Sequence, residues 1–478
     1  MRILKDSVHP LTVISKDVGY DVRRYRGCIL LLFFTQLILL LTAVLSENMP
    51  FFLLAILCGG LIFALTASSL QRFLLLIIVY ISVFTSTDYL TVMPVKVSFE
   101  LTGALVFIAL FCWLIVSFYR ENLTFRITAL DTAFAVFLFV TSLGAVIGFR
   151  NSNDVHFIRE ELFLLWLYVV YFLWVHSSVD KKWIRYFFWT IVGVSVIVFL
   201  EYAWEGLHRH GVLLSRIPTQ QAHLTQISIP FLLLFLTTTS SRRNKLLALA
   251  MLIPNFIVVL LSQQRALWAS VVITSLIIVG IYIFRTKSFV QRTFRLTIAL
   301  VLIVATVFVG MYFIQKLTRS YVQEALGERA ETFASMSADA SLLIRYVEIS
   351  KIWDRIEARP ILGSGLGDAF IRRIRGGTAN YVDNAYVYLL WKIGLVGLTS
   401  YLVIVFLFFR RCAFLLKSGI DEEYRHYTLA ALIGFIGLLI IGLTNTCLTR
   451  YRFELIWAML IGSVEIMARK IENRFAAE

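Results

Sequence analysis

The chain has 478 residues, of which 59% are hydrophobic and only 16% are charged, and its mean hydropathy is +0.80. Soluble proteins carry about 25% charged residues, so this composition excludes a soluble enzyme and a disordered protein. The formal net charge is +15, but the basic residues lie between apolar blocks and form no single patch, which argues against nucleic acid as a partner. The sequence therefore predicts an all-α, polytopic membrane protein.

Cysteine and histidine indicate neither a disulfide framework nor a metal site. The five cysteines are odd in number, form no CxxC pair and each lie in or beside an apolar block: Cys28, Cys58, Cys112, Cys412 and Cys447. Such cysteines are typical of packed or lipid-facing helices. The histidines show no ligand spacing either, so no metal and no other cofactor is expected.

Fourteen apolar blocks are long enough to cross a bilayer, whose hydrocarbon core of ~30 Å needs a helix of ~20 residues. In lipid every backbone group must be hydrogen-bonded internally, and blocks this continuous favour helices over barrel strands. Two of them, 73–93 and 158–176, are the most polar, so twelve spans is the alternative. The expected spans are 28–45, 50–68, 73–93, 98–118, 129–148, 158–176, 183–203, 221–239, 245–261, 266–284, 296–315, 385–409, 427–446 and 452–468.

Lysine and arginine in the loops predict the orientation. With the N-terminus in the cytoplasm, the inner segments carry 26 basic residues and the short outer loops carry 8. Both termini are then cytoplasmic, and the 69-residue loop 316–384 is extracytoplasmic. Every other connection is short, so this loop is the part of a single membrane domain, 1–478, that serves something other than crossing lipid.

Residues 341–359 of the large loop have the apolar spacing of an amphipathic helix, which can lie on a membrane surface. Pro360 ends it, and the sequence Ile-Leu-Gly-Ser-Gly-Leu-Gly follows at 361–367. This run lacks the Gly-Lys-Ser/Thr ending of a P-loop. We therefore expect a tight turn that brings the loop back to the helix bundle.

Three arginines, Arg372, Arg373 and Arg375, lie further along the loop, on the side where positive charge is rare. Two interpretations are open. They form a solvated charge run beside lipid headgroups, or some of them bind a phosphate-bearing lipid.

Two further arginines lie at the outer ends of spans. Arg265 joins two spans with almost no loop, which makes it either a functional-site candidate or an arginine that snorkels to the interface. Arg216 begins a polar stripe that continues at helical spacing through Thr219 or Gln220, then His223 and Gln226. This stripe faces either a water-filled cavity or a network of interhelical hydrogen bonds.

The segment Asp383-Asn384-Ala385-Tyr386 leads into the span that follows the large loop. Asp383 suits two roles: an N-cap for that span, or a carboxylate partly withdrawn from water that acts as a general base. Lys392 lies inside the same span. It either snorkels outward, pairs with Asp383 or Asp88, or lines a slot for an anionic ligand.

In this order the motifs resemble the superfamily of O-antigen ligases and Wzy polymerases, which build bacterial surface polysaccharides. The resemblance is strongest over about residues 215–410, in Ser-Gln-Gln-Arg265-Ala-Leu-Trp, Arg345-Tyr346, the Gly-rich turn and Asp383-Asn384-Ala-Tyr-Val-Tyr-Leu. Ligases of the family usually have His before the Asn or Ser that opens the span after the large loop. This chain has Asp383 there, similar to the Asp-Asn-x-Tyr form of the polymerases, which favours a polymerase.

The resemblance implies a donor glycan on undecaprenyl pyrophosphate, presented on the periplasmic face of the bacterial inner membrane. The loop 316–384 is then periplasmic, and the lipid pyrophosphate is the leaving group, so no nucleotide is needed. Membrane lipids are further partners, and such systems usually include a separate co-polymerase that sets chain length. Two alternatives stay open: a ligase, which differs only in its acceptor, and a flippase, for which two related halves would be expected.

Chemistry of this kind requires cations that hold the diphosphate and a base that takes a proton from the attacking sugar hydroxyl. Arginine suits the first task because its planar fork binds phosphate oxygens bidentately. The candidate diphosphate ligands are Arg265, Arg345 and Arg216, followed by Arg372, Arg373, Arg375 and Lys392. The candidate base is Asp383, with Asn384 and Tyr386 to orient it or the acceptor sugar. His223, Gln220 and Gln226 are candidates for the wall of the acceptor cavity.

Overall fold

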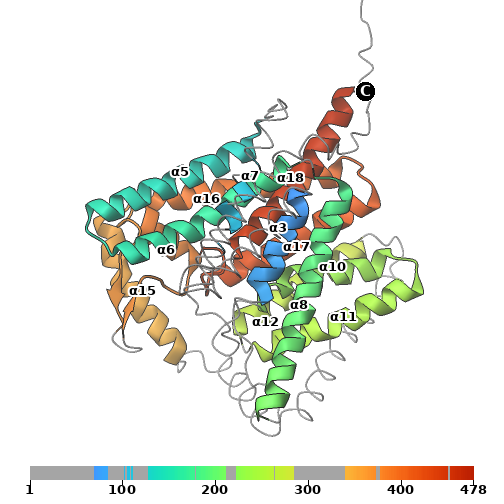
Figure 1. The fold of residues 1–478 in the computed structure, drawn as a ribbon, viewed down its shortest axis with the longest axis horizontal. Helices are drawn as coiled ribbons and strands as arrows, with labels where there is room; N and C mark the ends of the chain where they lie inside the picture. Colours follow the sequence, from blue (N-terminus) through green and yellow to red (C-terminus); the bar gives the residue numbers. More distant parts are fainter. Residues whose placement is uncertain are drawn as a thin grey trace, which may run out of the picture. The chain divides into compact units, whose positions relative to one another are not determined.

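The computed structural model describes residues 69–83, 127–177, 179–210, 222–262, 264–284, 340–372, 377–449 and 453–477, together with single positions between 102 and 113. Within these ranges the chain is almost entirely helical (Figure 1). The elements are α3 (Leu70–Val83), α5 (Ala129–Arg150), α6 (Val155–Trp166), the 3-10 helix η2 (Leu167–Val169), α7 (Val170–Val175), α8 (Lys181–His210), α10 (Thr225–Thr238), α11 (Arg242–Leu261), α12 (Arg265–Phe284), α15 (Ala340–Ala358), β1 (Phe370–Ile371), β2 (Thr378–Ala379), α16 (Ala385–Lys417), α17 (Glu422–Gly442) and α18 (Glu454–Ala477).

The expected helical fold is confirmed over this part of the chain, but fourteen spans are not. Five of the helices are long and apolar enough to cross a bilayer: α5, α8, α11, α16 and α17. Three others, α3, α10 and α12, are apolar but shorter. Four expected spans, 28–45, 50–68, 98–118 and 296–315, lie wholly or mostly outside the described residues, as does the start of the large loop.

Helix starts are set by polar caps. Thr128 and Asp131 form a capping box at α5: the Thr128 backbone N–H donates to the Asp131 carboxylate at 2.7 Å, and the Thr128 hydroxyl accepts from the Asp131 N–H. At α11 and α17 the caps are Ser241 and Asp421, whose side-chain oxygens accept from the backbone N–H groups of Asn244 and Tyr424. These caps satisfy backbone donors that the apolar stretches behind them cannot satisfy.

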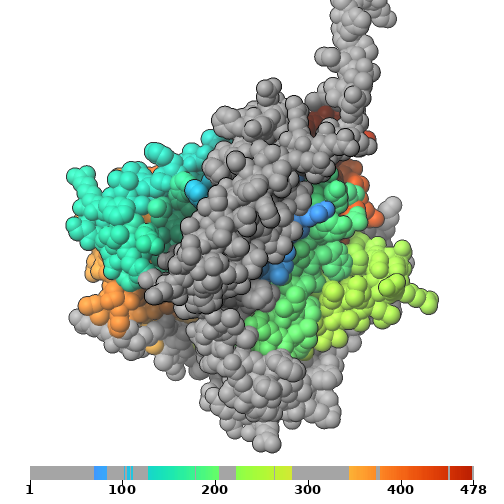
Figure 2. Space-filling view, in the orientation of Figure 1, coloured from blue at the N-terminus to red at the C-terminus, as the bar shows by residue number. Residues whose placement is uncertain are grey.

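Close helix packing depends on small residues. On α17, a Cβ at Gly434 would lie 2.7 Å from the Gln226 carbonyl oxygen, so α10 and α17 approach at backbone distance. Helix α5 packs against both α6 and α16. In the space-filling view α5 and α6 form one continuous surface in teal (Figure 2).

Buried ion pairs tie α18 to α5 and to the later part of α16. Glu465 of α18 is fully buried and accepts hydrogen bonds from Arg411 Nε of α16 at 2.8 Å and from Arg469 Nε at 3.0 Å. Arg469 also pairs with Asp131 of α5. Each buried charge therefore has a partner, as burial in an apolar bundle requires.

The amphipathic helix expected at 341–359 is confirmed as α15. Its side chains Ile352 and Ile356 are buried. The spacing predicts an apolar face of Leu342, Tyr346, Ile349, Trp353 and Ile356. Of these, Tyr346 and Trp353 are 72% and 46% exposed instead. The helix therefore packs on the protein with its Ile352 side and leaves two aromatic side chains on its outer surface.

Candidate functional site

The Gly-rich turn 361–367 docks into a break in helix α16. Gly394 interrupts this helix with φ 67°, a left-handed conformation that favours glycine. The break frees the N–H groups of Leu395 and Val396, which donate to the carbonyls of Pro360 (2.8 Å) and Ile361 (3.2 Å). Such a break is tolerated in an apolar bundle because another segment satisfies the freed groups.

The turn also donates hydrogen bonds to carbonyls of α16 that precede the break. Ser364 N–H donates to the Trp391 carbonyl at 2.9 Å, and Gly365 N–H donates to the Lys392 carbonyl at 3.0 Å. The chain then reaches α5, where Leu366 N–H donates to the Gly144 carbonyl at 2.9 Å. The expected return of the loop to the bundle is confirmed, and its partners are α16 and α5.

The glycines of the turn are required by close approach as well as by conformation. Gly365 has φ 87°, and a Cβ there would lie 2.4 Å from the Gly148 backbone nitrogen of α5. The side chains of Asn151 and Asn153, just after α5, donate to the Ser364 carbonyl at 2.9 and 3.1 Å. These two asparagines were not identified from the sequence, although two amides beside a helix end are typical of loop anchors.

Asp383 and Arg345 meet at the start of α16. Arg345 Nε, on the loop helix α15, lies 3.5 Å from Asp383 Oδ2, and the two side chains are 31% and 19% exposed. Of the two roles expected for Asp383, the cap belongs to its neighbour. Asn384 Oδ1 accepts from the N–H groups of Tyr386 and Val387, both at 3.0 Å. Asp383 therefore does not cap α16, and its carboxylate lies beside the Arg345 guanidinium.

Asn384 and Tyr386 also attach α16 to the end of α17. Asn384 Nδ2 donates to the Leu443 carbonyl at 2.8 Å, and the Tyr386 hydroxyl donates to the Leu439 carbonyl at 2.9 Å. Helix ends leave carbonyls without intrahelical partners, and these side chains supply donors there. Asn384 and Tyr386 therefore hold the start of α16, next to Asp383, against the end of α17.

The polar stripe expected around His223 and Gln226 lies between helices. Both side chains are fully buried. His223 Nε2 lies 3.2 Å from Gln264 Oε1, and Gln226 Oε1 accepts from the Ser270 hydroxyl of α12 at 2.9 Å. For these two residues the interhelical network, rather than the water-filled cavity, is the arrangement observed. Gln220 and Arg216 lie outside the described residues.

Helix α17 connects the stripe to the Asp383 region. Ser270 Oγ lies 2.8 Å from the Gly437 carbonyl of α17, and Leu443, which accepts from Asn384, lies six residues further along. Six helical residues span roughly 9 Å. Arg265, half-buried, begins α12 five residues before Ser270. The His223 and Gln226 stripe and the Asp383 region therefore contact the last two turns of the same helix, α17.

The remaining candidate cations are engaged elsewhere or lie outside the description. Arg372 is buried, pairs with Glu348 at 3.1 Å and has its guanidinium carbon 4.3 Å from the centre of the Tyr381 ring. Lys392 is fully buried and pairs with Glu161 of α6 at 2.6 Å, a partner that the sequence did not suggest. Both are internal to the fold in this structure. Arg373 and Arg375 are not among the described residues.

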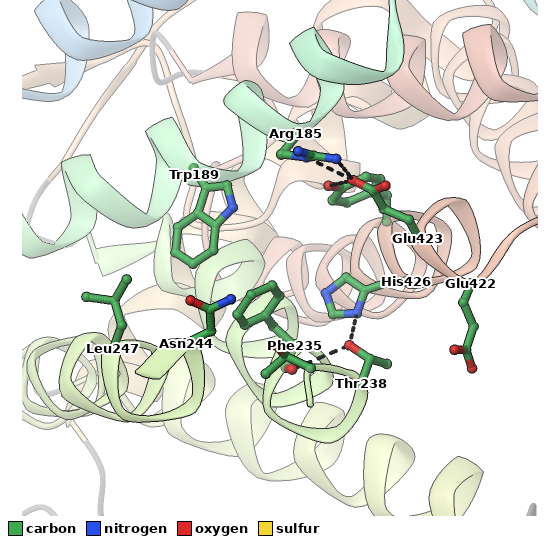
Figure 3. Close-up of a pocket in the computed structure, with 11 residues that line it drawn as sticks. Arg185, Trp189, Phe235, Thr238, Asn244, Leu247, Glu422, Glu423 and His426 are labelled. Carbon is green, nitrogen blue, oxygen red and sulfur yellow. Dashed lines mark hydrogen bonds and ion pairs between the residues drawn. The ribbon is translucent and has the colours of Figure 1, made fainter. Parts of the chain in front are cut away.

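A pocket of about 460 Å³ lies at the N-terminal end of α17, the end opposite to the one that Asn384 contacts (Figure 3). Its walls come from the start of α8, the end of α10 and the starts of α11 and α17. Arg185 donates to Glu423 at 2.6 Å, and Thr238 lies 3.3 Å from His426 Nδ1. The pocket lies at the N-terminal end of α17, whereas Asn384 and Asp383 lie near its C-terminal end. Because α17 runs from Glu422 to Gly442, the two ends are roughly 30 Å apart. It is therefore separate from the candidate site.

No group of three or more His, Cys, Asp or Glu side chains is arranged to hold a metal ion in the part of the chain that the structure describes. Of the candidate residues, the structure brings Arg345, Asp383 and Asn384 together at the start of α16.

Comparison with known families gives one match. Residues 246–402 match the family model described as O-antigen ligase, and no curated protein matches the chain. The matched segment contains Arg265, Arg345 and Asp383, together with the Gly-rich turn and the break in α16. This match supports the similarity of residues 246–402 to the O-antigen ligase and Wzy superfamily.

Proposed function

We propose that this protein polymerises oligosaccharide repeat units carried on undecaprenyl pyrophosphate, on the periplasmic face of the inner membrane. The observation that carries the proposal is the pairing of Arg345 with Asp383, which places a cation and a carboxylate together at the partly exposed end of α16. The family match over the same segment supports glycan transfer from a lipid-linked donor. Both termini are then cytoplasmic and the loop 316–384 is periplasmic.

The first chemical requirement is a cation at the leaving group. When the bond between the anomeric carbon and the phosphate oxygen breaks, the electron pair goes to the diphosphate, whose negative charge rises. Arg345 can hold that charge with two parallel N–H groups. Arg265, at the start of α12, is the second candidate ligand, because an arginine at the end of an apolar helix reaches the headgroup level of the lipid.

The second requirement is a base for the attacking sugar. The acceptor hydroxyl adds to the anomeric carbon as its proton passes to a carboxylate, and we assign that carboxylate to Asp383. A positioned general base contributes about 10² to 10⁴ in rate. The N-cap of α16 is Asn384, so the base is the one of the two expected roles that remains for Asp383.

The contact between the two residues suggests how binding prepares the reaction. Arg345 lies 3.5 Å from Asp383 in this structure. A diphosphate carries more negative charge than one carboxylate and competes for the same guanidinium. Donor binding then draws Arg345 from Asp383, whose oxygens become available to the acceptor hydroxyl.

A ligase is the second candidate function, because the matched family model bears that description. The bond made and broken would be the same, and the acceptor would be lipid A core or a protein. The aspartate at position 383, where ligases of the family usually have histidine, favours the polymerase. We also propose that a separate co-polymerase sets the chain length, as in related systems.

The test is the surface-glycan ladder of the native host after deletion of the gene. Single repeat units without long chains indicate a polymerase. Glycan that is absent from lipid A core while lipid-linked polymer accumulates indicates a ligase. An unchanged ladder would contradict both functions and favour a flippase or another transporter. Complementation with Asp383→Ala, at wild-type protein levels, then tests the base.

A further inference from the structure

A fully buried ion pair joins α16 to α6 and takes no part in the chemistry proposed above. Lys392 of α16 and Glu161 of α6 are 0% and 1% exposed, and their Nζ and Oε1 atoms are 2.6 Å apart. Ionisable groups inside an apolar bundle are costly, and they persist where they hold something in place or take part in function. What this pair holds can be followed from its remaining hydrogen bonds.

The two members of the pair bind adjacent residues of the large loop. Glu161 Oε2 accepts from the Gly367 N–H at 2.7 Å, and Lys392 Nζ donates to the Asp368 carbonyl. Gly367 cannot be replaced without displacing α6, because a Cβ there would lie 2.7 Å from the Asp154 carbonyl oxygen. The ion pair therefore fixes the end of the Gly-rich turn between α6 and α16.

From Asp368 the attachment continues to the loop helix. The Asp368 carboxylate accepts from Trp391 Nε1 of α16 at 2.7 Å and pairs with Arg355 of α15. Arg355 also donates to the Ala369 carbonyl at 3.0 Å. Asp368 thus joins α15 to α16, and its own backbone carbonyl is bound by Lys392 of the buried pair.

We propose that Glu161 and Lys392 are positioning residues that hold Arg345 beside Asp383; their catalytic consequence rests on the function proposed above. Helix α15 has three attachments to the segments that flank α16: Arg345 with Asp383, Glu348 with Arg372, and Arg355 with Asp368. The first and the last of these are ten residues apart on α15, or roughly 15 Å. Ile352 and Ile356 are buried on either side of Arg355, so the attachment at Asp368 restricts where the stiff helix, and with it Arg345, can lie.

The test neutralises the pair without leaving a lone buried charge. Glu161→Gln/Lys392→Met removes both charges together, because loss of one partner alone would strand the other in the bundle. The matched control is Glu465→Gln/Arg411→Met, which removes a pair of 2.8 Å on the same helix α16 but far from the loop. Asp368→Asn is a milder third variant, which weakens the link to Arg355 and leaves the ion pair intact.

The readout is the distance between positions 345 and 383, measured without reference to activity. Arg345→Cys/Asp383→Cys is introduced into full-length protein whose five native cysteines are replaced, and a short bifunctional thiol reagent is added. We expect the cross-linking rate to fall at least about fivefold in the Glu161/Lys392 variant and in Asp368→Asn, and to stay unchanged in the control. Thermal unfolding in detergent establishes that each protein is folded.

Equal cross-linking in all folded variants would overturn the proposal. If the Glu161/Lys392 variant does not fold, Asp368→Asn decides the question by the same criterion. The two test variants are also assayed with the native Arg345 and Asp383 in place. There they should lower the turnover number more than they raise the Michaelis constant for the donor. A protein that transfers no glycan would fail that second assay only, which separates failure of the proposed function from failure of the positioning role.

Discussion

Arg345 Nε and Asp383 Oδ2 lie 3.5 Å apart although Arg345 lies near the middle of the large loop and Asp383 at its end. Their contact depends on the return of the chain through the turn at 361–367, which docks into the break at Gly394. Both side chains are partly exposed, so a ligand can reach them. Partly exposed ion pairs contribute only about 0–1 kcal/mol to stability, and changes at this pair should therefore affect activity more than folding.

Asp383→Asn should abolish polymerisation while the protein stays folded. The amide keeps the size of the side chain but cannot accept the proton of the sugar hydroxyl, so the rate should fall at least about 100-fold. Polymer formed in membranes from a lipid-linked repeat unit measures the effect. The control is Asp354→Asn, an exposed residue of α15. A rate within twofold of wild type for Asp383→Asn would show that another group is the base.

Arg345→Gln should weaken donor binding, because the guanidinium no longer meets the diphosphate. We expect the Michaelis constant for the lipid-linked donor to rise about 10- to 100-fold, and Arg345→Lys to recover part of it since lysine keeps the charge without the bidentate fork. Arg359→Gln, at an exposed position just after α15, is the control for loss of one positive charge from the loop. A donor Michaelis constant that is equal in both glutamine variants would remove Arg345 from the diphosphate site.

The sequence predicted those features that depend on local patterns. The apolar blocks at 129–148 and 385–409 became α5 and α16, and the periodicity of 341–359 became α15, because burial of a continuous or one-sided apolar surface determines a helix largely by itself. The polar stripe of His223 and Gln226 was also recognised as buried polar chemistry. Its partners were not, because a helical face identifies a contact surface and not the helix that covers it.

Features that depend on distant parts of the chain could not be predicted. Glu161 and Lys392 are 231 residues apart, and nothing near either residue in the sequence indicates the other. Gly394 lies within an apolar block and resembles any packing glycine until the turn that fills the break is known. At the start of α16, Asp383 and Asn384 are both good caps, and only the geometry shows that Asn384 is the one that caps.

Asn384→Ala should reduce stability more than Asp383→Asn does. It removes the N-cap of α16, worth about 1 kcal/mol, and also the donor to the Leu443 carbonyl at the end of α17. We expect a lower unfolding temperature in detergent. Asn384→Asp, which keeps the capping oxygen, should restore part of the loss. An unfolding temperature equal to wild type for Asn384→Ala would mean that the cap and the α17 contact are dispensable.

Gly394→Ala should release the loop turn from α16. The residue has φ 67°, and a Cβ would lie 2.2 Å from the Ile361 carbonyl oxygen, which is backbone and cannot give way. Gly377→Ala is the matched control, since φ there is 77° and no atom lies within 4 Å of the added Cβ. Each substitution carries a conformational cost of about 1 kcal/mol, so the difference between the two variants isolates the close approach. We expect faster trypsin cleavage after Arg359 and a lower unfolding temperature for Gly394→Ala alone. If both variants are cleaved at the same rate, the docking of the turn into α16 does not hold the loop.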